Sequence, residues 1–322
     1  MYRRILVPLD GTHFGDHALP YAISIATRTG AALELVHVHR PRELEAGLES
    51  MPQYRYQHVE EAGIRRDNEA LEQEMALLEE RAADIELRYG VRASTRLLHG
   101  STARAIEQEI QDVVADLVVM ATHARRGISR LMHGDVAHQL VHDFNIPMLC
   151  VHPVSEDAPF DNGELKHFLV SLDGSPFSEQ IVDAVAPLAQ ALGARLSLVH
   201  VFSQRTIRPN GVQGEREITH REDAVAYLDE VADRLPTGLP EAELIVVESE
   251  DPATAIVDAL ASRPGAALAI ATHGRSGLSR MVLGSVADKV VEATHQPVLL
   301  YRPRLVRLPN GPLATAFGLG ND

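Results

Sequence analysis

The chain contains the same succession of motifs twice, and this duplication limits the folds that it can adopt. Residues 5–12, ILVPLDGT, correspond to residues 168–175, FLVSLDGS, and residues 30–38 correspond to 193–201, at an offset of 163 positions (173 − 10). Residues 121–123, ATH, return as 271–273, at an offset of 150 (271 − 121). A repeat of this length is a whole folded unit rather than one turn of a solenoid. The sequence therefore predicts two copies of one domain that differ in length at one place.

Composition and charge exclude several classes of protein. A chain of 322 residues can bury two cores, and 45% hydrophobic with 23% charged residues is typical of a globular protein. No run approaches the roughly 20 apolar residues of a membrane span, and the first residues show no secretory pattern. The single cysteine, Cys150, excludes an internal disulfide and is expected in the core. A net charge of −15 argues against nucleic acid as a partner. We expect a cytoplasmic protein.

Short apolar segments alternate with amphipathic ones through both copies. In copy one, strands are predicted at 5–9, 33–39, 91–98, 117–121 and 147–152, and helices at 17–29, 59–89, 103–113 and 136–143. In copy two, strands are predicted at 168–172, 196–202, 242–248, 267–271 and 298–301, and helices at 181–192, 222–235, 253–261 and 286–294. This alternation predicts an α/β fold made of two tandem doubly wound parallel five-stranded sheets.

Changes in composition divide the chain into four parts. The first domain is predicted at 1–153 and the second at 165–304, with a linker rich in Ser, Asp, Pro, Asn and Gly at 154–164. Residues 305–322 form a tail of weak periodicity, which is either a flexible end or an arm that lies on a neighbour.

The segment 271–285, ATHGRSGLSRMVLGS, carries the sharpest local signal. It begins at the carboxyl end of a predicted strand and ends where a helix begins, which is where ligands lie in open α/β sheets. Gly274 and Gly277 permit close approach of the backbone, and Ser285 offers a hydroxyl and an N–H at a helix start. The segment is either a phosphate cradle, or only a tight turn followed by a capped helix.

These residues resemble the glycine-rich signature of the universal stress protein family, Gly-x-x-Gly, nine residues, then Gly-Ser or Gly-Thr. Residues 271, 274, 284 and 285 match it at three of four positions, with Ala271 in place of the first glycine. The resemblance extends over both copies, including the Asp-Gly-Ser/Thr turns after the first strands. It implies an adenine nucleotide alpha hydrolase-like fold, with the copies related by a pseudo-two-fold axis and joined through strands 148–151 and 298–301.

The resemblance also implies that copy two binds ATP, with or without Mg²⁺. Asp173 would accept a hydrogen bond from a ribose hydroxyl, and Val201 would meet adenine through its backbone. Gly284 and Ser285 would hold phosphates, and Arg275 either neutralises them or is a solvated loop charge. The implied set is Ser171, Leu172, Asp173, Val201, Ile270, Ala271, His273, Gly274, Gly284, Ser285 and Val286.

Copy one departs further from the signature. Its second glycine is Ala124, and Asp135 replaces the hydroxyl residue. A carboxylate ~4 Å from a phosphate charge costs about 4 kcal/mol near a surface, whereas an N-cap contributes only about 1 kcal/mol. We expect a degenerate site that binds triphosphate poorly, with Pro8, Asp10 and Val38 as weaker candidate contacts for a nucleotide.

The histidines call for a separate interpretation. Asp135, His138 and His142 share one helix face close to His133, and such spacing can bind zinc, but a polar helix face is the favoured interpretation and no metal is expected. His37 and His200, in the second strands, are predicted to be paired polar groups near the sheet end.

Enzyme signatures are missing from the chain. It contains no Walker phosphate loop, no G-x-G-x-x-G and no H-E-x-x-H. We expect no catalysis beyond slow ATP hydrolysis. The favoured hypothesis is a nucleotide-dependent stress regulator, acting as a homodimer or an intramolecular pseudo-dimer on an unidentified protein partner. The alternatives are a nucleotide-free interaction scaffold and, less favoured, an enzyme of the wider superfold.

Overall fold

The structure is a computed structural model. It describes residues 2–39, 53–122, 136–143, 146–155, 157–204, 216, 218–272 and 285–303, and only the backbone at 53–66, 138, 142 and 143. The predicted tail at 305–322 therefore lies outside the described residues.

Each half of the chain alternates strands with helices in the predicted order. The first half contains β1 (Arg4–Pro8), α1 (His13–Asp16), α2 (Ala18–Thr29), β2 (Ala32–His39), α3 (Gln53–Tyr89), β3 (Ala93–His99), α4 (Thr102–Asp112), β4 (Leu117–Ala121), α6 (Val136–Asp143) and β5 (Met148–Val151). The second contains β6 (His167–Leu172), α7 (Pro176–Leu192), β7 (Arg195–Phe202), α8 (Arg221–Ala232), β8 (Glu243–Glu248), α9 (Pro252–Ala261), β9 (Ala267–Ala271), α10 (Ser285–Ala293) and β10 (Val298–Tyr301).

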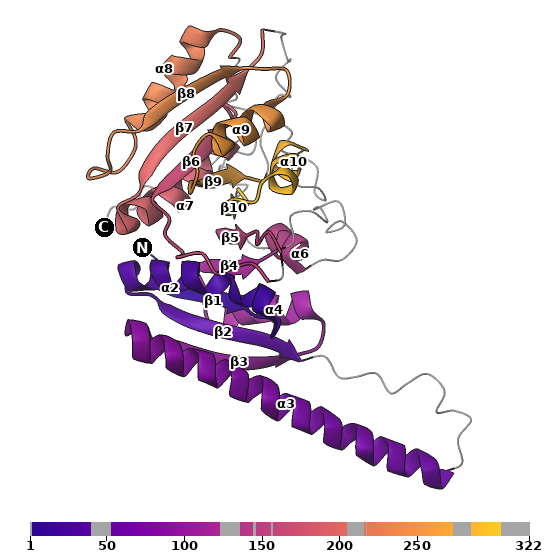
Figure 1. The fold of residues 1–322 in the computed structure, drawn as a ribbon. Coiled ribbons are helices and arrows are strands. Elements are labelled where there is room, and N and C mark those ends of the chain that lie inside the picture. Colours follow the sequence, from indigo (N-terminus) through magenta and orange to yellow (C-terminus); the bar gives the residue numbers. More distant parts are fainter. Residues whose placement is uncertain are drawn as a thin grey trace, which may run out of the picture.

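The two five-stranded sheets are joined into one sheet of ten strands, in the order β3-β2-β1-β4-β5-β10-β9-β6-β7-β8 (Figure 1). All neighbours within each half are parallel. At the seam β5 and β10 pair antiparallel, with Leu299 opposite Leu149, which confirms the predicted junction through the last strands. Because this one pair is antiparallel, the strands of the two halves run in opposite directions, and their carboxyl ends lie on opposite sides of the sheet along the strand axis.

Both halves are doubly wound. Buried residues of α2, α3, α7 and α8 belong to one core cluster, and those of α4, α6, α9 and α10 belong to a second cluster. Successive strand residues alternate between the two clusters, as the pleat requires, so that Leu6 faces one and Val7 the other. The helices therefore cover both faces of a parallel sheet, as predicted.

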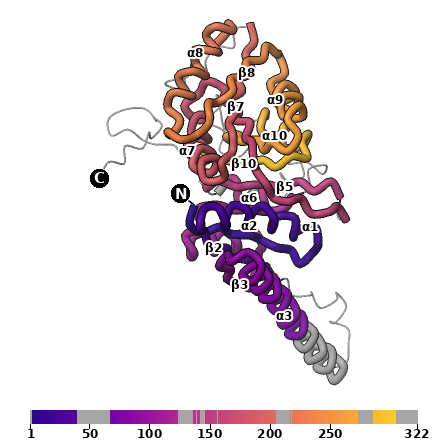
Figure 2. Tube along the Cα trace, turned by 60° about the vertical axis from the view of Figure 1, so that its left-hand side comes forward, coloured from indigo at the N-terminus to yellow at the C-terminus, as the bar shows by residue number. Residues whose placement is uncertain are grey.

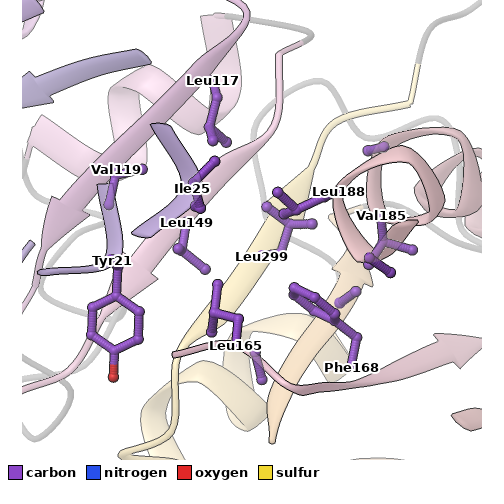
Figure 3. Close-up of a cluster of buried hydrophobic side chains, with 14 of the residues drawn as sticks. Tyr21, Ile25, Leu117, Val119, Leu149, Leu165, Phe168, Val185, Leu188 and Leu299 are labelled. Atoms are coloured by element: carbon purple, nitrogen blue, oxygen red, sulfur yellow. The ribbon is translucent and has the colours of Figure 1, made fainter. Parts of the chain in front are cut away.

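The core is continuous across the seam. Leu149 and Leu299 lie in the first cluster, together with Ile25 of α2 and Leu188 of α7 (Figure 3). Cys150 is buried in the second cluster, as expected. Helices α2 and α7 contact each other across the seam, and Figure 2 shows them side by side. Because burial of one leucine side chain stabilises a fold by about 1.5–3 kcal/mol, this shared core holds the halves together.

Capping residues set several helix starts. Ser175 accepts a hydrogen bond from the backbone N–H of Ser178 at 3.2 Å, and Pro176 occupies the first turn. Helix α7 therefore begins five positions before the predicted start at residue 181. Thr12 caps the short helix α1 in the same way, through the N–H of Gly15 at 3.2 Å. The sequence predicted one helix at 17–29, which corresponds to α2, and it predicted no helix at the position of α1.

The described residues of the connection between β5 and β6 contain no helix or strand, and they lie against α1 and α2. The Nε2 atoms of His13 and His17 lie 3.2 and 3.0 Å from the carbonyl oxygen of Ala158. The hydroxyl of Tyr21 donates to Asp161 at 2.9 Å. A Cβ at Gly163, whose φ is +68°, would lie 2.2 Å from the carbonyl oxygen of Pro20. The predicted linker region is thus packed against the first half over much of its length.

Helix α3 has 37 residues and its counterpart α8 has 12, a difference that exceeds the 13 residues by which the offset between the copies changes (163 − 150). His39 fixes α3 to the sheet, because its Nδ1 lies 2.8 Å from Glu74 and its Nε2 lies 3.1 Å from Asp67. These two carboxylates raise the pKa of the His39 imidazole, although its burial acts in the opposite direction. Within the described residues, no helix is long and apolar enough to cross a membrane.

Candidate functional site

The strand order reverses between β6 and β9, and this switch point brings most of the candidate residues together. Ser171 on β6 lies opposite Ile270 on β9 and opposite Val199 on β7. Leu172 lies opposite His200, so that Val201 follows at the same edge of the sheet. The structure thus collects Ser171, Leu172, Asp173, Val201, Ile270 and Ala271 at the carboxyl ends of three adjacent strands. This is where a doubly wound sheet opens a crevice for a ligand.

Asp173 is held in a tight turn directly after β6. Its Oδ1 accepts hydrogen bonds from the backbone N–H of Ser175 at 2.9 Å and from the Ser175 hydroxyl at 2.6 Å. Its own N–H donates to the Ser178 hydroxyl at 3.1 Å. Gly174 makes the turn possible with a φ of +83°. The half-buried carboxylate is therefore oriented at the strand end before any ligand arrives.

A histidine ties the first two strands of each copy together at this edge. His200 is fully buried, and its Nδ1 lies 2.8 Å from the carbonyl oxygen of Leu172. Because a carbonyl oxygen only accepts, Nδ1 carries the proton. His37 makes the same contact with Leu9, also at 2.8 Å. These bonds confirm the prediction that both histidines are paired polar groups near the sheet end.

Copy one reproduces the turn. The Oδ1 of Asp10 accepts from the N–H of Thr12 at 3.0 Å and from its hydroxyl at 2.6 Å. A Cβ at Gly15 would lie 2.3 Å from that Oδ1, so the turn depends on this glycine. Sequence reasoning missed Gly15, although its alignment with Ser178 at the offset of 163 (178 − 15) marks the position. Pro8 and Val38 lie at the carboxyl ends of β1 and β2, beside this turn.

The phosphate side of the candidate site is described only at the start of α10. Ser285 is exposed at the first position of that helix, and Val286 is half-buried. In the same first turn, Asp288 has a buried Oδ1 without a hydrogen-bond partner among the described residues. Burial, and secondarily the charge of Glu292, raises the pKa of the Asp288 carboxyl.

Several predicted site residues lie outside the described residues. They are Ala124, His133, Asp135, His273, Gly274, Arg275, Gly277 and Gly284. The side chains of His138 and His142 are also not described. Within the described part of the chain, no group of three or more His, Cys, Asp and Glu side chains could hold a metal ion.

A buried histidine lies at the seam, outside the candidate crevice. His152 follows β5, and its side chain is buried, with Nδ1 lying 3.2 Å from the carbonyl oxygen of Gln296. Its Nε2 is buried without a hydrogen-bond partner among the described residues. Burial lowers the pKa of the imidazole to about 4, a shift that the Gln296 carbonyl partly opposes. His152 is therefore neutral at ordinary pH.

Two doubly wound α/β units, each with an aspartate-glycine turn at its switch point and joined through their last strands, define a tandem α/β protein. The chain belongs to the universal stress protein family, whose model matches residues 1–152 and 164–302.

Known proteins support this assignment over different lengths. A universal stress protein of Mycolicibacterium smegmatis is 26% identical over 303 residues, which are 93% of this chain and 97% of that protein. One of Mycobacterium tuberculosis is 29% identical over 194 residues, but the match spans only 62% of that protein and 58% of this chain. The crystal structure of a universal stress protein from Archaeoglobus fulgidus aligns with a TM-score of 0.64 at 17% identity, covering 93% of this chain and 96% of that one. That likeness shows the fold alone.

Proposed function

We propose that this chain is an ATP-binding universal stress protein in which copy two holds the nucleotide and transmits its occupancy to a partner. The observation that carries the proposal is the preformed turn at Asp173. Two donors of Ser175 hold one carboxylate oxygen in place at the switch point, so that the group needs no reorganisation to receive a ribose hydroxyl. Family membership supports the same ligand, through the signature resemblance described above.

The proposed contacts divide into two groups. The nucleoside lies against the strand ends, with Asp173 on the ribose and with Leu172, Val201, Ile270 and Ala271 around adenine. The buried methyl group of Ala271 narrows this part of the crevice compared with a glycine.

The phosphates, with Mg²⁺ where it accompanies ATP, are proposed to lie at the start of α10. Gly274 and Gly284 would offer backbone N–H groups, and Ser285 its N–H and hydroxyl, while Val286 and His273 complete the contact set. The N-terminus of a helix favours an anion through its dipole and its unpaired N–H groups.

Copy one is proposed to bind triphosphate poorly, because Ala124 and Asp135 replace the glycine and the hydroxyl residue of the signature. Its strand-end turn is nevertheless built as in copy two, with Asp10 bonded to Thr12. A nucleoside or mononucleotide bound at Pro8, Asp10 and Val38 is therefore compatible with the proposal, whereas ATP is not.

The proposed role is regulatory rather than catalytic, with ATP hydrolysis slow at most. A regulator of this kind works only if its partner has different affinities for the occupied and the empty state. We place it in the cytoplasm, with a protein partner or a second copy of the chain reading the occupied state.

Mass spectrometry of small molecules released from the purified chain tests the proposal directly. We expect up to one equivalent of ATP or ADP per chain. In calorimetry, Asp173→Asn should weaken ATP binding by about tenfold, because a hydrogen bond to a charged group contributes about 1.5–3 kcal/mol. Ser285→Asp should weaken it further by placing a charge beside the phosphates. The matched control is Asp10→Asn in copy one, which should leave ATP affinity unchanged.

A chain that releases no nucleotide and whose melting temperature does not move in millimolar ATP would overturn the proposal. A free ATP concentration of 100 times Kd adds about 2.7 kcal/mol to the free energy of unfolding, and scanning calorimetry easily resolves the resulting shift in melting temperature. That outcome would leave the nucleotide-free interaction scaffold as the function of the fold. Turnover that is lost on changing one polar residue between 271 and 285 would instead indicate an enzyme.

A further inference from the structure

A second cleft opens at the seam, away from the strand ends of copy one. It has a volume of about 940 Å³, within the range of small-molecule sites. The residues just before β1, β3 and β4 line it from copy one, and α7 and the end of β10 line it from copy two. We call it the seam cleft and describe it by six of its lining residues, which are Tyr2, Arg3, Arg92, Val114, Asp183 and Tyr301.

Positive charge is available in the seam cleft although the chain carries a net charge of −15. The nearby carboxylate of Asp116 already accepts the backbone N–H groups of Arg3 and Arg4 at 2.7 and 3.1 Å. The guanidinium of Arg4 donates to the carbonyl oxygen of Val113. Among the described residues, the guanidinium groups of Arg3 and Arg92 have no hydrogen bond or ion pair. These two arginines are free to bind an anion.

The backbone places the two arginines on either side of β2. The carbonyl oxygens of Arg3 and Arg92 accept the N–H groups of Ala32 and Leu33, both at 2.9 Å. Strands in a sheet are separated by about 4.8 Å, so the two Cα atoms stand about 10 Å apart at the same edge. Arg92 is level with Arg4 rather than with Arg3, so the pleat starts the Arg3 and Arg92 side chains on opposite faces of the sheet. Both residues line the cleft at the amino ends of the strands, where long side chains can reach one anion around the end of the sheet. The one other carboxyl group in the cleft lining belongs to Asp183, whose pKa is raised by burial, against the opposing charge of Arg234.

A strained valine forms the apolar wall of the cleft. Val114 has a φ of +52°, and in the described part of the chain it is the one non-glycine residue with a positive φ. It ends α4 in a Schellman motif, in which its N–H bonds Gln111 and the N–H of Ala115 bonds Ile110. Glycine normally occupies this position, and a β-branched residue there costs about 1–3 kcal/mol. The Val114 side chain is nevertheless 77% exposed, so the fold gains little from it.

We propose that the seam cleft binds a small organic anion that joins a phosphate or carboxylate group to a compact apolar body. Arg3 and Arg92 hold the anionic group. Val114 contacts the apolar body, and Tyr301 forms the opposite wall beside Tyr2. The cost of a left-handed valine is then explained, because glycine at this position would remove the apolar contact.

Titration with 1-naphthyl phosphate, followed through its own fluorescence, tests this site on the full chain. Inorganic phosphate supplies the anion alone and 1-naphthol the apolar body alone, so each should bind at least tenfold more weakly. Arg3→Gln and Arg92→Gln should each weaken binding of the probe about three- to tenfold, as expected for charge-assisted bonds near a surface. The matched control is Arg104→Gln, an exposed arginine on α4 outside the cleft, which should leave the affinity unchanged.

Val114→Gly separates the functional role from a structural one. It relieves the strained backbone, so the melting temperature should stay level or rise, while the affinity for 1-naphthyl phosphate falls severalfold. The proposal is overturned if the probe does not bind saturably, if Arg104→Gln weakens binding as much as Arg92→Gln, or if inorganic phosphate binds as well as the probe. Binding that Ser285→Asp abolishes and that Arg3→Gln and Arg92→Gln leave intact also overturns it, because the probe would then occupy the crevice of copy two.

Discussion

Replacement of His152 by glutamine is expected to make the fold less sensitive to acid. His152 is buried at the seam and its imidazole has a pKa of about 4, against 6.5 for an exposed histidine. When the pH falls below 6.5, the unfolded chain takes up a proton that the folded chain refuses. Stability therefore falls between pH 6.5 and 4 and is flat above and below this window.

The size of the effect follows from the 2.5-unit difference (6.5 − 4). The loss reaches about 3 kcal/mol at pH 4 and about 2 kcal/mol at pH 5, since each unit is worth 1.36 kcal/mol. Glutamine does not titrate in this range, so the variant lacks this loss. Its stability at pH 7.5 should be lower than that of the natural chain by about 1 kcal/mol for imperfect packing.

Urea unfolding at pH 7.5 and 5.0, followed by circular dichroism, measures both quantities. Other groups titrate in this interval, but they do so equally in both proteins, so the difference between the two pH slopes isolates His152. His220→Gln, which removes a histidine that is 74% exposed, is the matched control and should follow the natural chain. If the natural chain and His152→Gln lose the same stability between the two pH values, the reasoning about the buried neutral imidazole is refuted.

Three further changes test the seam, the connection and the attachment of α3. Leu299→Ala, at a fully buried position opposite Leu149, should cost 2–5 kcal/mol in urea unfolding, and an unchanged midpoint would contradict a shared core. Gly163→Ala forces a Cβ to within 2.2 Å of a backbone oxygen at a φ of +68°, so the melting temperature should drop by several degrees, whereas Gly265→Ala, with open space around it, should show only the smaller cost of its φ. The pKa of His39 is raised in the folded chain, so the stability that this residue contributes is complete below pH 6.5 and is lost as the pH rises through the folded-state pKa. Hydrogen exchange in α3 should therefore accelerate with pH by more than its intrinsic rate does. His39→Gln should abolish that additional acceleration.

Strand positions were predictable because fully buried strands are short, continuous apolar runs. The predicted segments 117–121, 267–271 and 298–301 agree with β4, β9 and β10 at both ends. The duplication predicted how the halves join, because one antiparallel pair between the last strands of two parallel units covers the exposed edge strand of each. Helix starts were harder, although the Ser175-Pro176 pair that begins α7 was a readable capping signal.

Other features depend on contacts between distant residues, which no local pattern reports. The turn residues after β6 were predicted as a site, but the two bonds that orient Asp173 come from Ser175, which was not among the candidates. The packing of Gly163 on Pro20 joins segments more than 140 positions apart, and composition predicted only a linker there. Valine rarely adopts a left-handed backbone conformation, so nothing in the sequence indicates the positive φ of Val114.

The antiparallel pair of β5 and β10 also decides which ends of the two halves are neighbours. Tyr301, in the wall of the seam cleft, lies opposite Ala271, and its carbonyl oxygen accepts the N–H of Thr272 at 2.9 Å. The carboxyl ends of the second copy's strands, where its crevice lies, are thus next to the amino ends of the first copy's strands. A molecule in the seam cleft would lie beside Tyr301, which is hydrogen-bonded to the residue that follows β9, one of the strands proposed to bind the nucleotide. The crevice of the first copy faces the opposite end of the sheet.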